Sequence, residues 1–180
     1  MKRRYKIVAF SDLHIGSILA PWPAEYTTLP DPRTGDRMRW VPTPTMNTLN
    51  HFADEAIPRA VKGADIVLWA GDLCDGVQKK SQGKYVVTSD LNYQEEAAIF
   101  SLERWIPDPP PMFFVHGTDY HAEQQRPMER AIARHFGAEF GDDLLIDECG
   151  IRIYMNHFVP VTRSALMYRT TPVARDLMLL

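Results

Sequence analysis

The stretch Lys6-Ile-Val-Ala-Phe-Ser-Asp-Leu-His14 is a short apolar run that ends in an acid and an imidazole two residues apart. Its uninterrupted apolar residues predict a buried parallel strand over residues 5–11. In a strand, residues i and i+2 point to the same face, so Asp12 and His14 are expected to project side by side at its carboxyl end. A carboxylate beside an imidazole is typical of a metal site.

A second apolar run repeats this pattern. Residues 64–75 contain a predicted strand that ends in Gly71-Asp72 and is followed by Asp75. Gly71 lets the backbone turn tightly, and Asp72 can project into the same crevice as Asp12. Asp75 can orient a metal ligand through a hydrogen bond.

Two later segments bring further candidate ligands. A third short apolar strand, residues 112–115, leads into His116-Gly-Thr-Asp-Tyr-His121. Residues 144–148 and 151–159 flank Cys149-Gly150 and predict a hairpin, in which His157 ends a row of apolar side chains. The sequence therefore predicts a metal site built from several strand ends.

Apolar periodicity predicts helices between these strands. The first is capped by Thr45, runs to about Lys62 and has Phe52 in its core stripe. The second spans Leu91 to Ile106, and the third spans residues 127–137. Strands alternating with helices predict a layered α/β sheet with flanking helices, right-handed crossovers and a site at the carboxyl ends of the strands.

Length and composition predict one domain over residues 1–180 of an ordinary globular protein, with 45% hydrophobic and 24% charged residues. A net charge of −3 argues against a broad basic surface for nucleic acid. Two cysteines without Cys-x-x-Cys spacing favour a reduced, cytoplasmic setting. No run has the length of an export core or a membrane span, so no membrane partner is expected.

Residues 19–44 form a Pro-rich insertion that carries the aromatic residues Trp22, Tyr26 and Trp40. A small hairpin is expected around Asp31-Pro-Arg-Thr-Gly35. Long loops in compact domains are often functional, so the segment is either an ordered lid or a surface excursion.

The ordered set Asp12-x-His14, Gly71-Asp72-x-x-Asp75, a Gly-containing turn after a third strand and His157 at a later strand end resembles the calcineurin-like metallophosphoesterases. The resemblance implies hydrolysis of a phosphomonoester or phosphodiester by metal-activated water. It also implies that Asp12 and His14 hold the first metal, Asp72 bridges, and His157 binds the second, with Asp75 behind the ligands. Mixed carboxylates and imidazoles suit two divalent ions of Mn, Fe or Zn.

The sequence departs from that family at two places. Thr118 stands where the family has a ligating Asn, so Asp119 or His121 is expected to supply the missing ligand atom, or His121 protonates the leaving group. The family's closing Gly-His-x-His is absent from the 180 residues. The expectation is that the chain is C-terminally incomplete or that the remaining ligands come from elsewhere.

Two other interpretations remain open: a degenerate phosphoesterase fold acting as a binding or interaction module, and an unrelated α/β protein whose acids cap helices. The substrate is expected to be a phosphate ester, with nucleotides or nucleic acid as candidates. Arg163, Arg169 and Arg175 can meet phosphates, and the aromatic insertion can stack a base. The sequence does not fix an oligomeric state.

Overall fold

A four-stranded parallel sheet forms the centre of the structure, a computed structural model that describes residues 4–30, 34–78, 83–118 and 127–157. Its strands lie in the order β1 (Ile7–Phe10), β4 (Ile66–Trp69), β5 (Met112–Val115) and β6 (Glu139–Gly141). All neighbouring pairs are parallel. The predicted α/β class with a parallel sheet and flanking helices is therefore confirmed.

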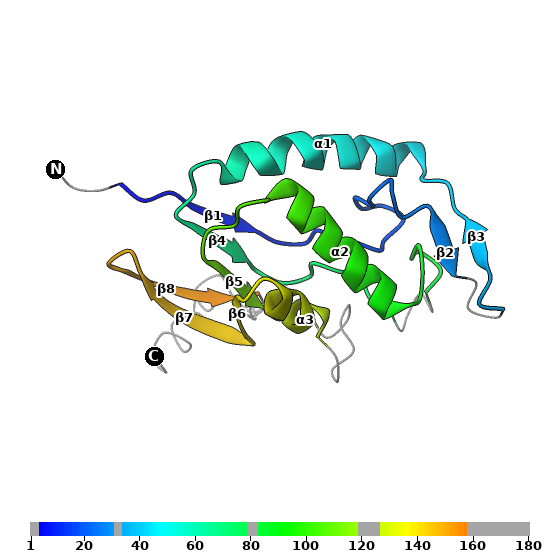
Figure 1. Cartoon of the computed structure of the whole chain (residues 1–180). Helices are drawn as coiled ribbons and strands as arrows, with labels where there is room; N and C mark the ends of the chain where they lie inside the picture. The colour runs from blue at the N-terminus through cyan, green and yellow to red at the C-terminus, as the bar shows by residue number, and fades with distance from the viewer. Residues whose placement is uncertain (1–3, 31–33, 79–82, 119–126, 158–180) are drawn as a thin grey trace, which may run out of the picture.

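Three helices link successive strands of this sheet and cover one of its faces (Figure 1): α1 (Pro44–Val61), α2 (Leu91–Trp105) and α3 (Met128–His135). The larger core lies between helices and sheet, where Trp69, Leu102 and Phe114 are almost fully buried. The carboxyl ends of the parallel strands lie along one edge of the sheet, which is where such sheets carry their sites.

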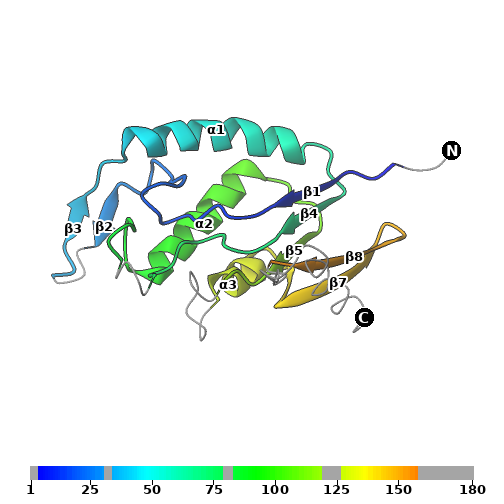
Figure 2. The same ribbon diagram turned by 180° about the vertical axis from the view of Figure 1, so that it is seen from behind.

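An antiparallel hairpin, β7 (Asp143–Glu148) and β8 (Ile151–Asn156), packs on the opposite face of the sheet (Figure 2). A second apolar cluster joins the two layers, with Leu68 and Val115 from the sheet against Ile146 and Met155 from the hairpin. The predicted hairpin is confirmed. The hairpin matters for the candidate site because β8 ends directly before His157, a predicted metal ligand.

The first helix begins earlier than predicted. Thr43 caps it, since the Thr43 hydroxyl accepts a hydrogen bond from the Met46 N–H at 3.2 Å, and Pro44 occupies the first helical position. Proline favours that position because it has no N–H to leave unpaired, so the cap predicted at Thr45 is wrong. Met46 and Val61 are buried as predicted, but Phe52, also expected in the core, is 68% exposed, because the buried face of α1 continues through Asn50, Ala53 and Ile57.

The Pro-rich insertion is anchored to the helical layer. Its predicted hairpin is present as β2 (Thr28–Pro30) paired antiparallel with β3 (Arg37–Arg39). Trp22 is fully buried, stacks on Tyr93 of α2 and bonds to Asn50 of α1. The aromatic content of the insertion thus serves packing in the described structure, and a lid role stays a prediction.

Two details of the sheet differ from expectation. Strand β1 is only partly buried, because within the described residues it lies at the sheet edge and has one neighbour. Strand β6 was not predicted, since Glu139-Phe-Gly141 is too short to show a pattern. None of the helices in the described ranges has the length and apolar character needed to cross a membrane.

Candidate metal centre

The turns that follow β1 and β4 run side by side beyond the sheet. The N–H of Asp12 donates to the carbonyl of Gly71 at 3.2 Å, and that of His14 to the carbonyl of Asp72 at 3.0 Å. The Ile15 N–H continues the row, donating to the Leu73 carbonyl at 2.9 Å. The two turns that carry the predicted ligands are therefore held together by backbone hydrogen bonds.

These turns contain unusual backbone conformations. The φ angles of Asp12, His14 and Asp72 are 59°, 50° and 51°, a left-handed region that costs a non-glycine residue roughly 1–2 kcal/mol. Such residues gather at functional sites, where the surrounding structure holds them in place. The strand itself ends at Phe10, so the predicted alternation of an extended strand is not what brings Asp12 and His14 together.

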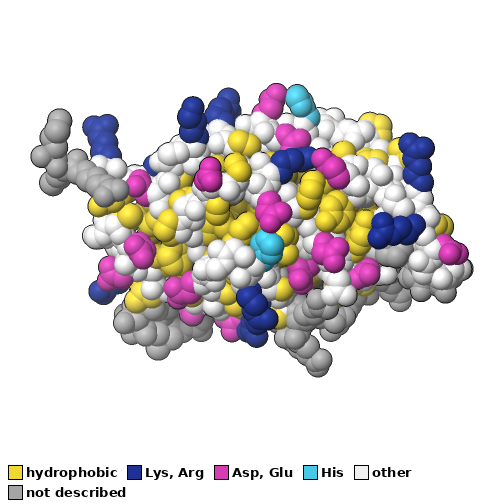
Figure 3. Space-filling model, viewed as in Figure 1, with side chains coloured by type: hydrophobic (Ala, Val, Ile, Leu, Met, Phe, Trp, Pro, Cys, Tyr) yellow, Lys and Arg dark blue, Asp and Glu magenta, His cyan; other side chains and the backbone are white. Residues whose placement is uncertain are grey.

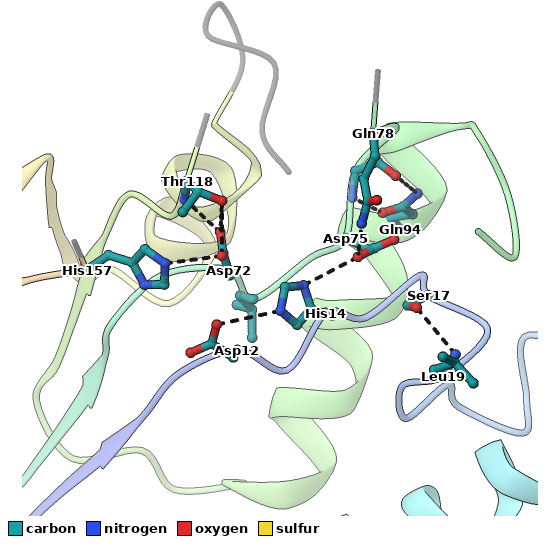
Figure 4. A network of polar contacts seen from close by, with 12 residues as sticks. Asp12, His14, Ser17, Leu19, Asp72, Asp75, Gln78, Gln94, Thr118 and His157 are labelled. Carbon is teal, nitrogen blue, oxygen red and sulfur yellow. Dashed lines mark hydrogen bonds and ion pairs between the residues drawn. The ribbon is translucent and has the colours of Figure 1, made fainter. Parts of the chain in front are cut away.

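Three side chains from three strand ends converge beside these turns (Figure 4). Asp12, Asp72 and His157 each offer a ligand atom, and these atoms all lie within 4.8 Å of one another. Asp72 and His157 are well buried, whereas the Asp12 side chain is 56% exposed. Two carboxylates and an imidazole make a donor set that suits a divalent transition metal.

His157 is oriented by the strand it faces. Its Nδ1 lies against the carbonyl of Ala70, which can only accept, so Nδ1 carries a proton and donates it. Its Nε2 lies 3.1 Å from Oδ2 of Asp72. Nε2 therefore faces the Asp72 carboxylate, in a position where it can act as a metal ligand. A backbone carbonyl behind a ligating histidine is the usual way to fix its tautomer.

His14 pairs with a buried acid on one side and the exposed acid on the other. Its Nδ1 lies 3.3 Å from Oδ1 of Asp75, and its Nε2 lies 3.6 Å from Oδ1 of Asp12. The contact with Asp75 is the main reason that the pKa of His14 is raised, partly opposed by burial and supported by the charges of Asp72, Asp75 and Asp12. A carboxylate behind a histidine directs the other ring nitrogen outward as a ligand.

Thr118 contacts the Asp72 carboxylate with both its N–H and its hydroxyl, and so orients a candidate ligand. Its N–H donates to Asp72 Oδ1 at 2.7 Å, and its hydroxyl lies 3.3 and 3.2 Å from the two carboxylate oxygens. Glycine makes this packing possible, because a Cβ on Gly71 would lie 2.7 Å from the Cα of Gly117 and from the ring of His157. The Gly-Asp and Gly-Thr turns thus fit together only without side chains at these glycines.

The structure brings together most of the predicted site residues. Asp12, His14, Asp72 and His157 meet at one edge, with Asp75 and Thr118 behind them (Figure 4). The predicted ligand Asp119 and the predicted proton donor His121 lie outside the described residues, as do Arg163, Arg169 and Arg175.

A cavity of about 400 Å³ adjoins the site and shares Asp12 and His14 with it. Its other walls come from β1, from the start of the Pro-rich insertion and from α1. The side chains on these walls are apolar, among them Phe10, Leu19 and Phe52. Neither Lys nor Arg occurs among the described residues of this lining.

Two buried polar residues that hold the site were missed by sequence reasoning. Gln94 is fully buried and bonds to Gly76, and Glu129 is 2% exposed and accepts a hydrogen bond from the Leu73 N–H at 3.3 Å. The feature of the sequence that could have identified them is a polar residue within the apolar stripe of a predicted helix. Gln94 precedes Ala98 by one turn, and Glu129 precedes Ala133 by one turn.

Comparison with models of known protein families gave no match, and no curated protein matched the sequence.

Proposed function

We propose that the chain is a metal-dependent phosphoesterase of the calcineurin-like kind. The observation that carries this proposal is the convergence of Asp12, Asp72 and His157, whose ligand atoms lie within 4.8 Å of one another although they follow three different strands. The layered arrangement of helices, parallel sheet and hairpin supports it, since it gathers the strand ends along one edge. Asp12 and Asp72 also have left-handed backbone conformations, and such strained residues are typical of functional sites.

In this proposal two divalent ions would be held here, with Asp72 as a ligand of both. Asp12 and His14 lie on one side of the Asp72 carboxylate and His157 on the other. When bound, such ions polarise a phosphoryl oxygen and lower the pKa of water. The protein's own part is to hold the donors: Thr118 fixes Asp72, the Ala70 carbonyl fixes His157, and Asp75 fixes His14. His121 stays the proposed proton donor to the leaving group.

The surroundings of the site favour a phosphate ester with an apolar organic group. The cavity that shares Asp12 and His14 is lined mainly by apolar side chains, and its volume of about 400 Å³ suits a small molecule. The helix-covered face of the molecule, shown in Figure 3, carries lysine and arginine side chains scattered among acidic ones. A nucleic-acid substrate needs a continuous basic surface, so a small phosphate ester is favoured over a polynucleotide.

One observation favours a second function, a metal-binding module without catalysis. Thr118 uses both its N–H and its hydroxyl on Asp72, so it does not supply the second-metal ligand that the family resemblance implies at this position. Metal stoichiometry separates the two functions. A two-metal enzyme takes up about two ions per chain at saturation, whereas a module takes up one or none.

Activity measured with Mn²⁺ and a chromogenic phosphodiester tests the proposal. The wild-type protein should release product, and Asp12→Asn and Asp72→Asn should be inactive because each removes a charged ligand. Asp36→Asn is the matched control, since Asp36 is exposed in the turn between β2 and β3. Equal activity in wild type and both ligand variants would overturn the proposed function.

A further inference from the structure

The helical layer holds loop backbone through buried amide side chains. Asn50 of α1 bonds to both the N–H and the carbonyl of Trp22, and Gln94 of α2 does the same to Gly76. Both amides lie on the buried faces of their helices. The two loops differ, because the loop of Gly76, unlike that of Trp22, carries residues of the candidate metal centre.

Both polar atoms of the Gln94 side-chain amide form hydrogen bonds with backbone groups. Its Oε1 accepts from the Gly76 N–H at 2.9 Å, and its Nε2 donates to the carbonyls of Gly76 at 3.2 Å and Thr88 at 2.7 Å. A carboxylate here would face two carbonyl oxygens with no proton to donate. An apolar side chain would leave three backbone groups without this partner, two of them in the buried Gly76, which costs free energy for each buried group.

The other ligand turn also rests on Gln94. A Cβ on Gly16 would lie 2.5 Å from the Cδ and Oε1 atoms of Gln94, so glycine is needed where this turn crosses the amide. The turns are joined next to this point, since the Asp75 N–H donates to the Ile15 carbonyl at 3.0 Å. One side chain therefore contacts the turn that follows His14 and the turn that contains Asp75.

The path from Gln94 to the candidate ligands is short. Gly76 follows Asp75 directly, and Oδ1 of Asp75 lies 3.3 Å from Nδ1 of His14. The same ring presents Nε2 toward Asp12 (Figure 4). The backbone that Gln94 contacts at Gly76 is therefore next to the acid that faces the His14 ring.

We propose that Gln94 is a positioning residue of the metal centre. Through Gly76 and Asp75 it sets the orientation and the tautomer of His14, with the proton on Nδ1 and the lone pair of Nε2 facing the metal position. This inference rests on the metal centre of the proposed function and is independent of the phosphate-ester substrate. The proposal gives α2 a role in orienting a metal ligand in addition to its role in packing.

The test compares Gln94→Glu with Asn50→Asp, which makes the same amide-to-carboxylate change in the corresponding contact of α1. The ring nitrogen signals of His14 are recorded by NMR in the metal-free protein, at a pH where the ring is neutral. Wild type and Asn50→Asp should show one tautomer protonated on Nδ1, and Gln94→Glu should show a mixture. Mn²⁺ affinity, measured by calorimetry, should fall about 10–100-fold in Gln94→Glu alone.

Each outcome decides the proposal. Unchanged His14 signals in Gln94→Glu, or equal changes in both variants, would overturn it, because either result reduces Gln94 to ordinary packing. A wild-type protein that binds no Mn²⁺ contradicts the proposed function, while the metal-free NMR signals still decide the role of Gln94. If Gln94→Glu does not fold, Gln94→Met removes the polar atoms at similar volume and carries the same expectations.

Discussion

Nε2 of His157 lies 3.1 Å from Oδ2 of Asp72, although one residue follows the β7–β8 hairpin and the other follows the central sheet. The contact joins the two layers at the candidate metal centre. Because Nδ1 of His157 contacts the Ala70 carbonyl, Nε2 is the ring nitrogen that can act as a metal ligand.

Replacing His157 by Gln should lower Mn²⁺ affinity by about 10–100-fold or more, since even the partner behind a metal-bound histidine is typically worth that much. Calorimetric titration of both proteins measures the change. His51→Gln is the control, because His51 lies exposed on α1 and pairs only with the exposed Glu55 among the described contacts. Equal Mn²⁺ affinity in wild type and His157→Gln would remove His157 from the ligand set.

Replacing Gly71 by Ala should abolish metal binding. The new Cβ would lie 2.7 Å from the His157 ring and from the Cα of Gly117, and it would also strain the left-handed backbone at φ 84°. Gly63→Ala is the matched control, because φ is 69° there and nothing lies within 4 Å. Both variants should lose roughly 1–2 kcal/mol of unfolding free energy to backbone strain. Mn²⁺ affinity should fall only in Gly71→Ala. Unchanged affinity in Gly71→Ala would show that the close packing of Gly71 against Gly117 and His157 is not required for metal binding.

Replacing Glu129 by Gln should make the stability less dependent on pH. Burial raises the pKa of Glu129, and Oε2 has no hydrogen-bond partner among the described residues. A raised pKa in the folded state contributes stability that is present below the ordinary glutamate pKa of about 4.3 and is lost as pH rises through the folded value. Wild type should therefore lose stability relative to Glu129→Gln as pH rises.

Urea unfolding at several pH values measures this difference between wild type and Glu129→Gln. Glu96→Gln, an exposed position on α2, should follow wild type at every pH. A stability difference between wild type and Glu129→Gln that stays constant with pH would contradict the assigned cause.

Replacing Phe52 by Ser should raise KM for esters with apolar organic groups and leave KM for a small polar phosphate ester unchanged. Phe52 lines the cavity beside Asp12 and His14, yet it is 68% exposed, so the fold should tolerate the change. Glu55→Ser on the same helix is the control, because Glu55 is exposed and is not part of the cavity lining. An equal change in KM for both ester types would argue against the cavity as a substrate site.

The sequence allowed the order of strands and helices to be predicted because each strand is a short apolar run that ends in polar residues. Strands β1, β4 and β5 and the β7–β8 hairpin lie where these runs predict them. The predicted meeting of Asp12 with Asp72 followed from the general rule for the carboxyl ends of parallel strands. Chain topology was enough to bring these two acids together.

Other features depend on packing that periodicity alone does not contain. Phe52 fits a helical stripe, but the orientation of α1 turns it outward and buries Asn50 instead. The left-handed conformations of Asp12 and His14 are imposed by pairing with the neighbouring turn, which local sequence does not reveal. Gln94 was overlooked because its partners are backbone groups, which are the same in every sequence.

The most direct test of the central claim is an anomalous difference map from crystals of the protein soaked in Mn²⁺. The proposal predicts two peaks that share Asp72, one of them also in contact with Asp12 and the other also in contact with His157. A fully soaked crystal with no peak at these three side chains, or with Mn²⁺ bound only elsewhere, would contradict the metal centre and the function proposed from it.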